Sequence, residues 1–216
     1  MFIGHVALGL AAKRAAPRLS LALLIAAAQF ADMLWPILIF AGIEEVRILP
    51  GITKLTPLDF VSYPWSHSLV MLIAWGLLLG WIVRRRDPRA LPVVAALVVS
   101  HWVLDFITHR PDMPLYPGGP KFGLGLWNSL GGTLAVELPL FLAGTAIYFR
   151  TTRARDNIGT AATFILLALL LAIYAGDIMS DAAPPSATAI GIAGVAGAAI
   201  FTAWSWWADR HREVRP

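Results

Sequence analysis

Three ionisable residues lie four positions apart at the end of a long apolar segment. His101, Asp105 and His109 lie in or directly after the run from Ala90 to Thr108. At helical spacing, positions i, i+4 and i+8 project from one face. Ionisable side chains at membrane depth are costly and usually mark an ion path, a proton relay or a metal. Imidazole and carboxylate together suit a zinc-type ion, so the spacing predicts a divalent-metal site.

The composition indicates that this site belongs to an integral membrane protein. Hydrophobic residues make up 58% of the 216 residues and charged residues only 14%, whereas soluble domains have roughly 25% charged residues. The chain has no cysteine, so any metal must be held by imidazole and carboxylate. Six apolar runs are long enough to span a bilayer: 19–42, 68–83, 90–108, 133–149, 158–180 and 187–207.

These runs predict an all-α, polytopic membrane helical bundle with about six spanning helices. The first ten residues, MFIGHVALGL, are apolar but reach only about 15 Å as a helix. We therefore expect them to form a short re-entrant or interfacial helix. Residues 1–155 are expected to be the metal-site membrane domain. Residues 156–216 are expected to be a C-terminal helical hairpin that serves as scaffold within the same single domain.

The basic residues predict the orientation of the bundle. If each apolar run crosses the membrane once, 13 of the 17 Lys and Arg residues lie on one side. Only Arg47, Lys54, Arg110 and Lys121 lie on the other. Because basic residues accumulate on the cytoplasmic side, both basic ends of the chain are expected there, with the site toward the outer leaflet. The net charge of +4 therefore reflects topology, and no nucleic-acid partner is expected.

Further ligands are expected at the same depth. Counting about 1.5 Å per residue from the cytoplasmic basic residues places Asp32 at about 21 Å and His67 at about 25 Å. His101 and Asp105 come to about 18 and 24 Å in a core about 30 Å thick. His5 reaches only about 12 Å unless its segment is a tilted half-helix. The predicted metal ligands are His5, Asp32, His67, His101, Asp105 and His109.

The spacing along one helix also limits how the ions are held. His101 and His109 are about 12 Å apart along the axis, while metal–ligand bonds are about 2 Å, so one ion cannot bind both. Asp105 lies between them and is the expected bridge between two ions, the first bound with His101 and the second with His109 or His5. Two bridged ions suit displacement at phosphorus, because one activates water and the other stabilises the leaving oxygen.

Two irregular loops are expected on the outer side, over residues 43–66 and 110–132. The second is dense in Pro and Gly, and long loops beside ionisable residues are typical of an active-site rim or lid. Carboxylates near these loops are candidates for the general base, and basic residues for binding a phosphate. The expected catalytic residues are Glu137 and Asp59, and the expected substrate-binding residues are Lys121 and Arg110.

Several motifs resemble one bacterial family. They are Gly4-His5, Phe30-Ala31-Asp32, PLDFVSYPWSHSL (Pro57–Leu69), HWVLDFITHRPDMPLYPGG (His101–Gly119) and GLGLWNS (Gly123–Ser129). In order and spacing they resemble the bacterial inner-membrane predicted metal-dependent hydrolases, which include a LexA-regulated inner-membrane member. The resemblance covers roughly residues 1–155 and implies hydrolysis at a metal site in the bacterial inner membrane.

The ligand order His, Asp, His, His-x3-Asp is also similar to that of zinc-dependent phospholipase C and P1-type nucleases. In those soluble helical enzymes, the Asp of the His-x3-Asp pair bridges two zinc ions. That resemblance puts Asp32, His67, His101 and Asp105 on one zinc, and Asp105, His5 and the N-terminal amine on another. The chain departs from the pattern in having no clear His-x3-Glu pair for a third zinc, for which His109 with Glu137 is a partial substitute.

The expected function is hydrolysis of a phosphoester bond in a lipid-linked or amphipathic substrate, within the lipid bilayer. A metal-ion or proton-coupled transporter is an alternative, which the absence of internal repeats disfavours. A membrane protein with a structural metal is another, which a closed four-ligand site would support. The Ala- and Gly-rich C-terminal hairpin permits close helix packing and therefore a homo-oligomer.

Overall fold

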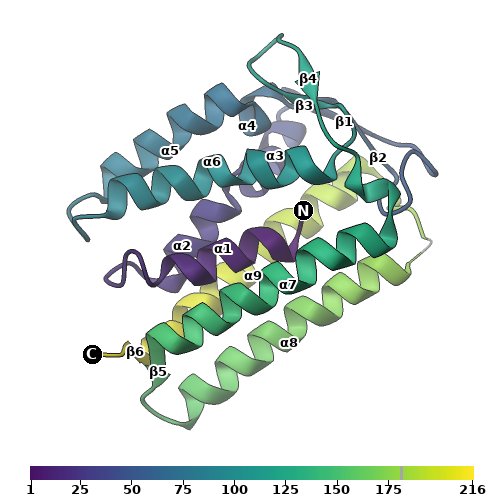
Figure 1. Cartoon of the computed structure of the whole chain (residues 1–216). Helices are drawn as coiled ribbons and strands as arrows, with labels where there is room; N and C mark the ends of the chain where they lie inside the picture. The colour runs from purple at the N-terminus through teal and green to yellow at the C-terminus, as the bar shows by residue number, and fades with distance from the viewer. Residues whose placement is uncertain (181) are drawn as a thin grey trace.

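The structure is a computed structural model that describes residues 1–180 and 182–216, and its main elements are helices (Figure 1). They are α1 (Ile3–Ala12), α2 (Leu21–Ala28), α3 (Phe30–Phe40), α4 (Pro64–His67), α5 (Leu69–Val83), α6 (Ala90–Thr108), the 3-10 helix η1 (Leu126–Asn128), α7 (Leu130–Thr151), α8 (Asn157–Met179) and α9 (Ala187–Arg210). The prediction of an all-α membrane bundle is confirmed.

Short strands pair in two-stranded antiparallel sheets beside the helices. The pairs are β1 (Glu45–Ile48) with β2 (Leu58–Ser62), β3 (Met113–Pro114) with β4 (Lys121–Phe122), and β5 (Thr152–Ala154) with β6 (Arg212–Val214). The first two pairs lie in the loops that were expected to form a rim, and they meet at one end of the bundle (Figure 1). The third pair lies at the opposite end and joins α7 to the C-terminus.

The number of spanning helices is lower than predicted. Within the described residues, α6, α7, α8 and α9 are long and apolar enough to cross a membrane, and the bent pair α2–α3 makes at most a fifth span. The prediction of about six spans is therefore too high. Ser68 is extended (ψ 144°) and separates α4 from α5, so α5 has only 15 residues. That is about 22 Å of helix against a core about 30 Å thick.

The first long apolar run is a broken helix, not one straight span. α2 and α3 are bent by 61° at Gln29, which has φ −97° and ψ 10°. Pro36 further weakens α3 because it has no N–H for the helical ladder. Beside the break, the carbonyl of Ala28 accepts a hydrogen bond from His101 Nδ1 at 2.9 Å. The interruption therefore lies at the predicted site and contributes a main-chain group to it.

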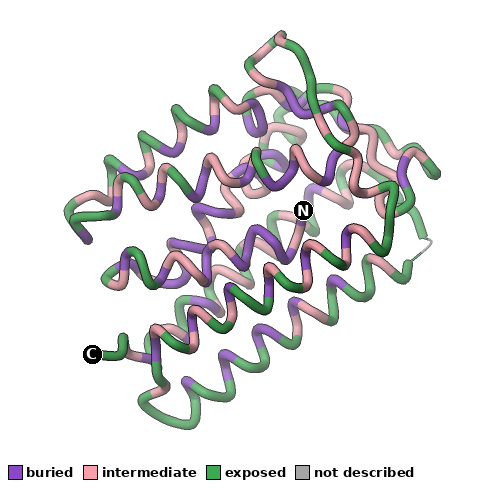
Figure 2. Tube along the Cα trace, in the orientation of Figure 1, coloured by how far each residue is buried: buried purple, intermediate pink, exposed green. Residues whose placement is uncertain are grey.

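α1 is an internal helix of the bundle and not an interfacial one. Ile3, Val6 and Leu10 are at most 2% exposed and share a core with α7 and α8. α1 approaches α7 so closely at Gly144 that an added Cβ would lie under 3.0 Å from the carbonyl oxygen of Ala7. The N-terminus consequently lies near the centre of the molecule, among buried residues (Figures 1 and 2).

The C-terminal helices pack on the broken helix. α9 lies against α2 and α3. Side chains at Gly191 and Gly194 would meet Phe40 and Pro36 of α3, so these two glycines allow close packing inside one chain. A homo-oligomer through the hairpin stays a prediction.

Candidate metal centre

Asp105, on α6, is the centre of a buried cluster and is only 2% exposed. Its Oδ1 lies 2.5 Å from the amine of Met1 and 3.1 Å from His5 Nε2. Its Oδ2 lies 3.1 Å from His101 Nε2 and 3.7 Å from His109 Nε2. The two oxygens thus face different sets of nitrogen atoms, and this is the arrangement that a carboxylate needs to bridge two ions.

Asp32 brings a second set of ligand atoms to the other side of His101. Its Oδ1 lies 3.5 Å from His67 Nε2 and 3.7 Å from His101 Nε2. Within the described residues, two groups have ligand atoms that all lie within 4.8 Å of one another: His5, His101 and Asp105, and Asp32, His67 and His101. The two groups share His101, and because Nε2 of one imidazole can bind only one ion, they cannot each hold an ion with all three of their residues.

Groups behind the imidazole rings determine which nitrogen faces the carboxylates. A carbonyl only accepts hydrogen bonds, so the contact with Ala28 places the proton of His101 on Nδ1 and leaves Nε2 free. His101 Nε2 is buried and has no hydrogen bond of acceptable geometry, although Asp105 lies close. Metal-ligating histidines typically donate their other N–H to a carbonyl or carboxylate. The orphaned Nε2 therefore fits a metal ligand.

His5 packs directly on His101. The two rings are stacked, with centroids 3.7 Å apart and planes 2° apart, and both side chains are fully buried. His5 lies on α1, so the burial of that helix brings this predicted ligand to the site. Counting residues from the cytoplasmic end had placed it too low in the membrane.

Glu44 also lies at the site, although no motif in the sequence marks it. It is 4% exposed, and its carboxylate accepts hydrogen bonds from the N–H groups of Trp65 (2.8 Å) and Ser66 (2.9 Å) and from Ser66 Oγ (2.6 Å). Ser66 Oγ in turn lies 2.7 Å from His67 Nδ1. Because the hydroxyl donates to Glu44, it accepts from Nδ1 and leaves Nε2 of His67 directed toward Asp32.

We expect Glu44→Gln to weaken metal binding by about 10–100-fold, as outer groups that orient histidine ligands typically do. The amide replaces one of the two oxygens that accept from the three donors, so His67 loses its fixed orientation. The matched control is Glu45→Gln, because Glu45 is exposed and pairs with Arg47. Zinc affinity measured against a competing chelator distinguishes them, and equal affinity in the two variants would contradict this positioning role.

The predicted rim residues lie together but outside both ligand groups. Arg110 forms ion pairs with Asp59 and, at 3.0 Å, with Asp112 Oδ2. Lys121 Nζ donates to a main-chain carbonyl of β2 at 2.8 Å. The rim reaches the cluster through Asp112, whose Oδ1 lies 3.0 Å from His109 Nδ1. Arg110 and Lys121, the two cations predicted to bind a phosphate, thus already have protein partners. Binding of a substrate phosphate by these residues stays a prediction.

Tyr63 supports His109 from behind. Its hydroxyl donates to Asp112 Oδ1 at 3.0 Å and lies 3.3 Å from His109 Nδ1. Burial raises the pKa of Tyr63 well above its ordinary value, and the neighbouring Asp112 raises it further. The hydroxyl therefore remains protonated and acts as a hydrogen-bond donor within this network.

Glu137, on α7, holds the beginning of α1. Its Oε2 accepts hydrogen bonds from the N–H groups of Phe2 (3.1 Å) and Gly4 (3.3 Å). The first N–H groups of a helix have no partner within the helix, and a carboxylate there is favoured by the helix dipole. Glu137 therefore ties the helix that carries His5 to α7.

The fold and the cluster together define a polytopic helical membrane protein with a buried group of histidine and aspartate side chains. A family model described as YdjM inner membrane protein matches residues 1–179. The chain therefore belongs to the YdjM inner membrane protein family. All of the predicted site residues lie within the matched segment. Comparisons with curated proteins and with solved structures give no match.

Proposed function

We propose that this inner-membrane protein is a zinc-dependent hydrolase that cleaves a phosphoester bond in a lipid-linked or amphipathic substrate. The observation that carries the proposal is the position of Asp105, whose two oxygens face separate nitrogen ligands. The donor atoms are all nitrogen and oxygen, which suits zinc. When bound, zinc acts as a Lewis acid that lowers the pKa of water and polarises a phosphoryl oxygen.

The residues divide into ligands and proton carriers. In this proposal Asp32, His67 and His101 hold one ion with Asp105, and His5 holds the second with Asp105. His109 supports Asp105 from the rim side, because its Nε2 is 3.7 Å away and outside both ligand groups.

Glu137 is preferred to Asp59 as the general base. Asp59 is ion-paired with Arg110 at the rim, whereas Glu137 is 1% exposed and accepts a hydrogen bond from the N–H of Gly4, the residue before His5. Arg110 and Lys121 are proposed to attract the substrate phosphate to the rim.

Metal analysis of the purified protein, followed by a substrate screen, tests this function. We expect one to two equivalents of zinc in the wild type and most of it lost in His101→Ala. The control is His211→Ala, because His211 pairs with Asp156 outside the cluster. Hydrolysis of p-nitrophenyl phosphate and its bis ester should follow the metal content. Bound metal without hydrolysis of any phosphoester would instead favour a structural metal, and a metal-free wild type would refute the site.

We also propose that the cluster lies in the outer half of the membrane, with both basic ends of the chain in the cytoplasm. Single cysteines at Lys54, Lys121, Arg86 and Arg153 test this orientation, since the four positions are exposed and the chain has no cysteine of its own. A membrane-impermeant thiol reagent applied outside should label the first two and not the last two. The reverse pattern would refute the orientation.

A further inference from the structure

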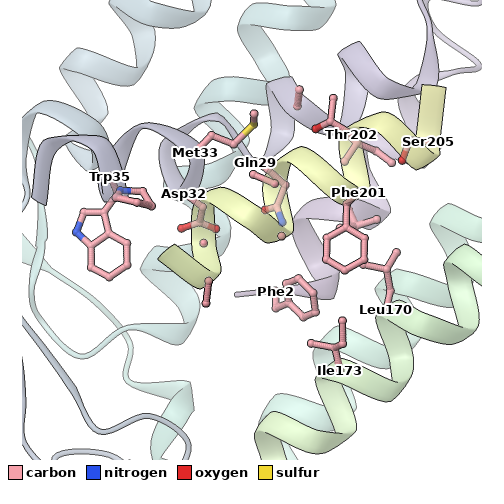
Figure 3. A pocket seen from close by; sticks show the side chains of 18 of the residues that line it. Phe2, Gln29, Asp32, Met33, Trp35, Leu170, Ile173, Phe201, Thr202 and Ser205 are labelled. Atoms are coloured by element: carbon pink, nitrogen blue, oxygen red, sulfur yellow. The ribbon is translucent and has the colours of Figure 1, made fainter. Parts of the chain in front are cut away.

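A long apolar cavity lies between α1–α3 and the C-terminal helices α8 and α9 (Figure 3). Its volume is about 410 Å³, within the range of about 300–1,000 Å³ that is typical of small-ligand sites. Most of its lining is apolar, including Val6, Leu170 and Phe201. The lining residues of α9 run from Ile190 to Ser205, which corresponds to about 22 Å of helix.

Asp32 connects this cavity to the metal centre. It is one of the lining residues, and its side chain is 43% exposed, whereas those of His67, His101 and Asp105 are at most 3% exposed. Figure 3 shows its carboxylate between Trp35 on one side and the part of the cavity near Gln29 on the other. A molecule in the cavity therefore reaches the ligand cluster at the Asp32 carboxylate.

The lining of the cavity is mostly apolar, and its polar members are Gln29, Asp32, Asp177, Thr202 and Ser205. Gln29 Oε1 and Ser205 Oγ are buried in the lining and have no hydrogen-bond partner. A hydrocarbon chain gains free energy from burial against the apolar part of this surface.

We propose that the cavity binds a single alkyl or acyl chain of the substrate while its phosphoester lies at Asp32 and the metal centre. This inference rests on the proposed hydrolase function and names the substrate class of that same site. Half of a bilayer core is about 15 Å thick, so a cavity that is lined over about 22 Å of α9 is long enough to hold the chain of a membrane lipid. α9 thus becomes part of the substrate site as well as a scaffold.

The test uses two neighbouring alanines of α9. Ala198 lines the cavity, whereas Ala199 is exposed and is not part of the lining, so Ala198→Phe fills the cavity and Ala199→Phe is the matched control. The probes are butyl-, octyl- and dodecylphosphonate, which are not hydrolysed at phosphorus. Binding is measured on the zinc-loaded protein in lipid nanodiscs, with partition into protein-free nanodiscs subtracted.

We expect dodecylphosphonate to bind at least about tenfold more tightly than butylphosphonate in the wild type and in Ala199→Phe, because added methylene groups are buried. Ala198→Phe should lose this preference and keep its zinc. Gly197→Leu is the second cavity-filling variant should Ala198→Phe not fold, since an added Cβ there meets only Phe201, at 3.8 Å. Equal chain-length preference in the cavity and control variants would overturn the inference.

Hydrolysis assays separate this inference from the function on which it rests. If chain-length preference depends on Ala198 but no phosphoester is hydrolysed, the chain site stands and the hydrolase proposal fails. If short soluble esters are hydrolysed and Ala198→Phe changes neither hydrolysis nor binding of any chain length, the hydrolase proposal stands and the chain site is refuted.

Discussion

Asp105→Asn is expected to remove most of the bound zinc and to lower hydrolysis by orders of magnitude. The amide keeps the shape of the side chain but removes the negative charge that both ions would share. It also replaces one of the two oxygens that face the nitrogen ligands His5 and His101, and an amide nitrogen is a donor that cannot bind a cation. Metal content by mass spectrometry and turnover of a chromogenic phosphoester measure the two effects.

The matched comparison is His109→Ala. Its Nε2 is 3.7 Å from Asp105 and belongs to neither ligand group, so its loss should reduce metal affinity or activity by only about 10–100-fold, as for weaker or outer ligands. If His109→Ala abolished metal binding while Asp105→Asn kept it, the bridging carboxylate would be refuted. The centre would then have to be rebuilt around His109 at the rim.

Gly144→Leu is expected to detach α1 from α7 and to lower the zinc content below that of the wild type. A Cβ at this position already meets the carbonyl of Ala7, and a backbone atom cannot move away by a change of rotamer as a side chain can. Overpacking of this kind typically costs about 1–3 kcal/mol of stability. Since α1 carries His5, its displacement would remove the residue that is proposed to hold a second ion with Asp105.

Gly131→Leu is the control for this substitution. Gly131 lies on the same helix, but an added Cβ there meets nothing within 4 Å. Thermal unfolding in detergent and zinc stoichiometry should therefore change in Gly144→Leu and remain near wild type in Gly131→Leu. A Gly144→Leu protein with the stability and the zinc content of the wild type would show that the close approach of α1 and α7 is not needed.

Local features of the sequence were sufficient to predict the class of protein and most of the candidate ligands. Helical periodicity acts within one element, so the shared face of His101, Asp105 and His109 follows from their spacing alone. Membrane helices also run across a layer of known thickness, and for that reason counting residues placed Asp32 and His67 near the same depth. The metal ligands and the helical membrane class could therefore be proposed without coordinates.

Contacts between elements that are far apart in the chain could be read only from the folded structure. His5 reaches Asp105 because α1 packs against α7 at Gly144 and is held by Glu137, and no local pattern encodes a contact between residues that far apart. The same holds for the cavity, which forms where α9 crosses the broken helix α2–α3.

Glu44 is the simplest example of a residue whose surroundings no local sequence pattern encodes. It and Glu45 are adjacent acidic residues, yet one is buried on Ser66 and the other is exposed beside Arg47. The residue types and their repeat along each helix are properties of the amino-acid sequence alone. The burial of these residues, their partners and the number of spans depend on packing between elements. The free energy of packing comes from side chains that are brought together only in the folded chain.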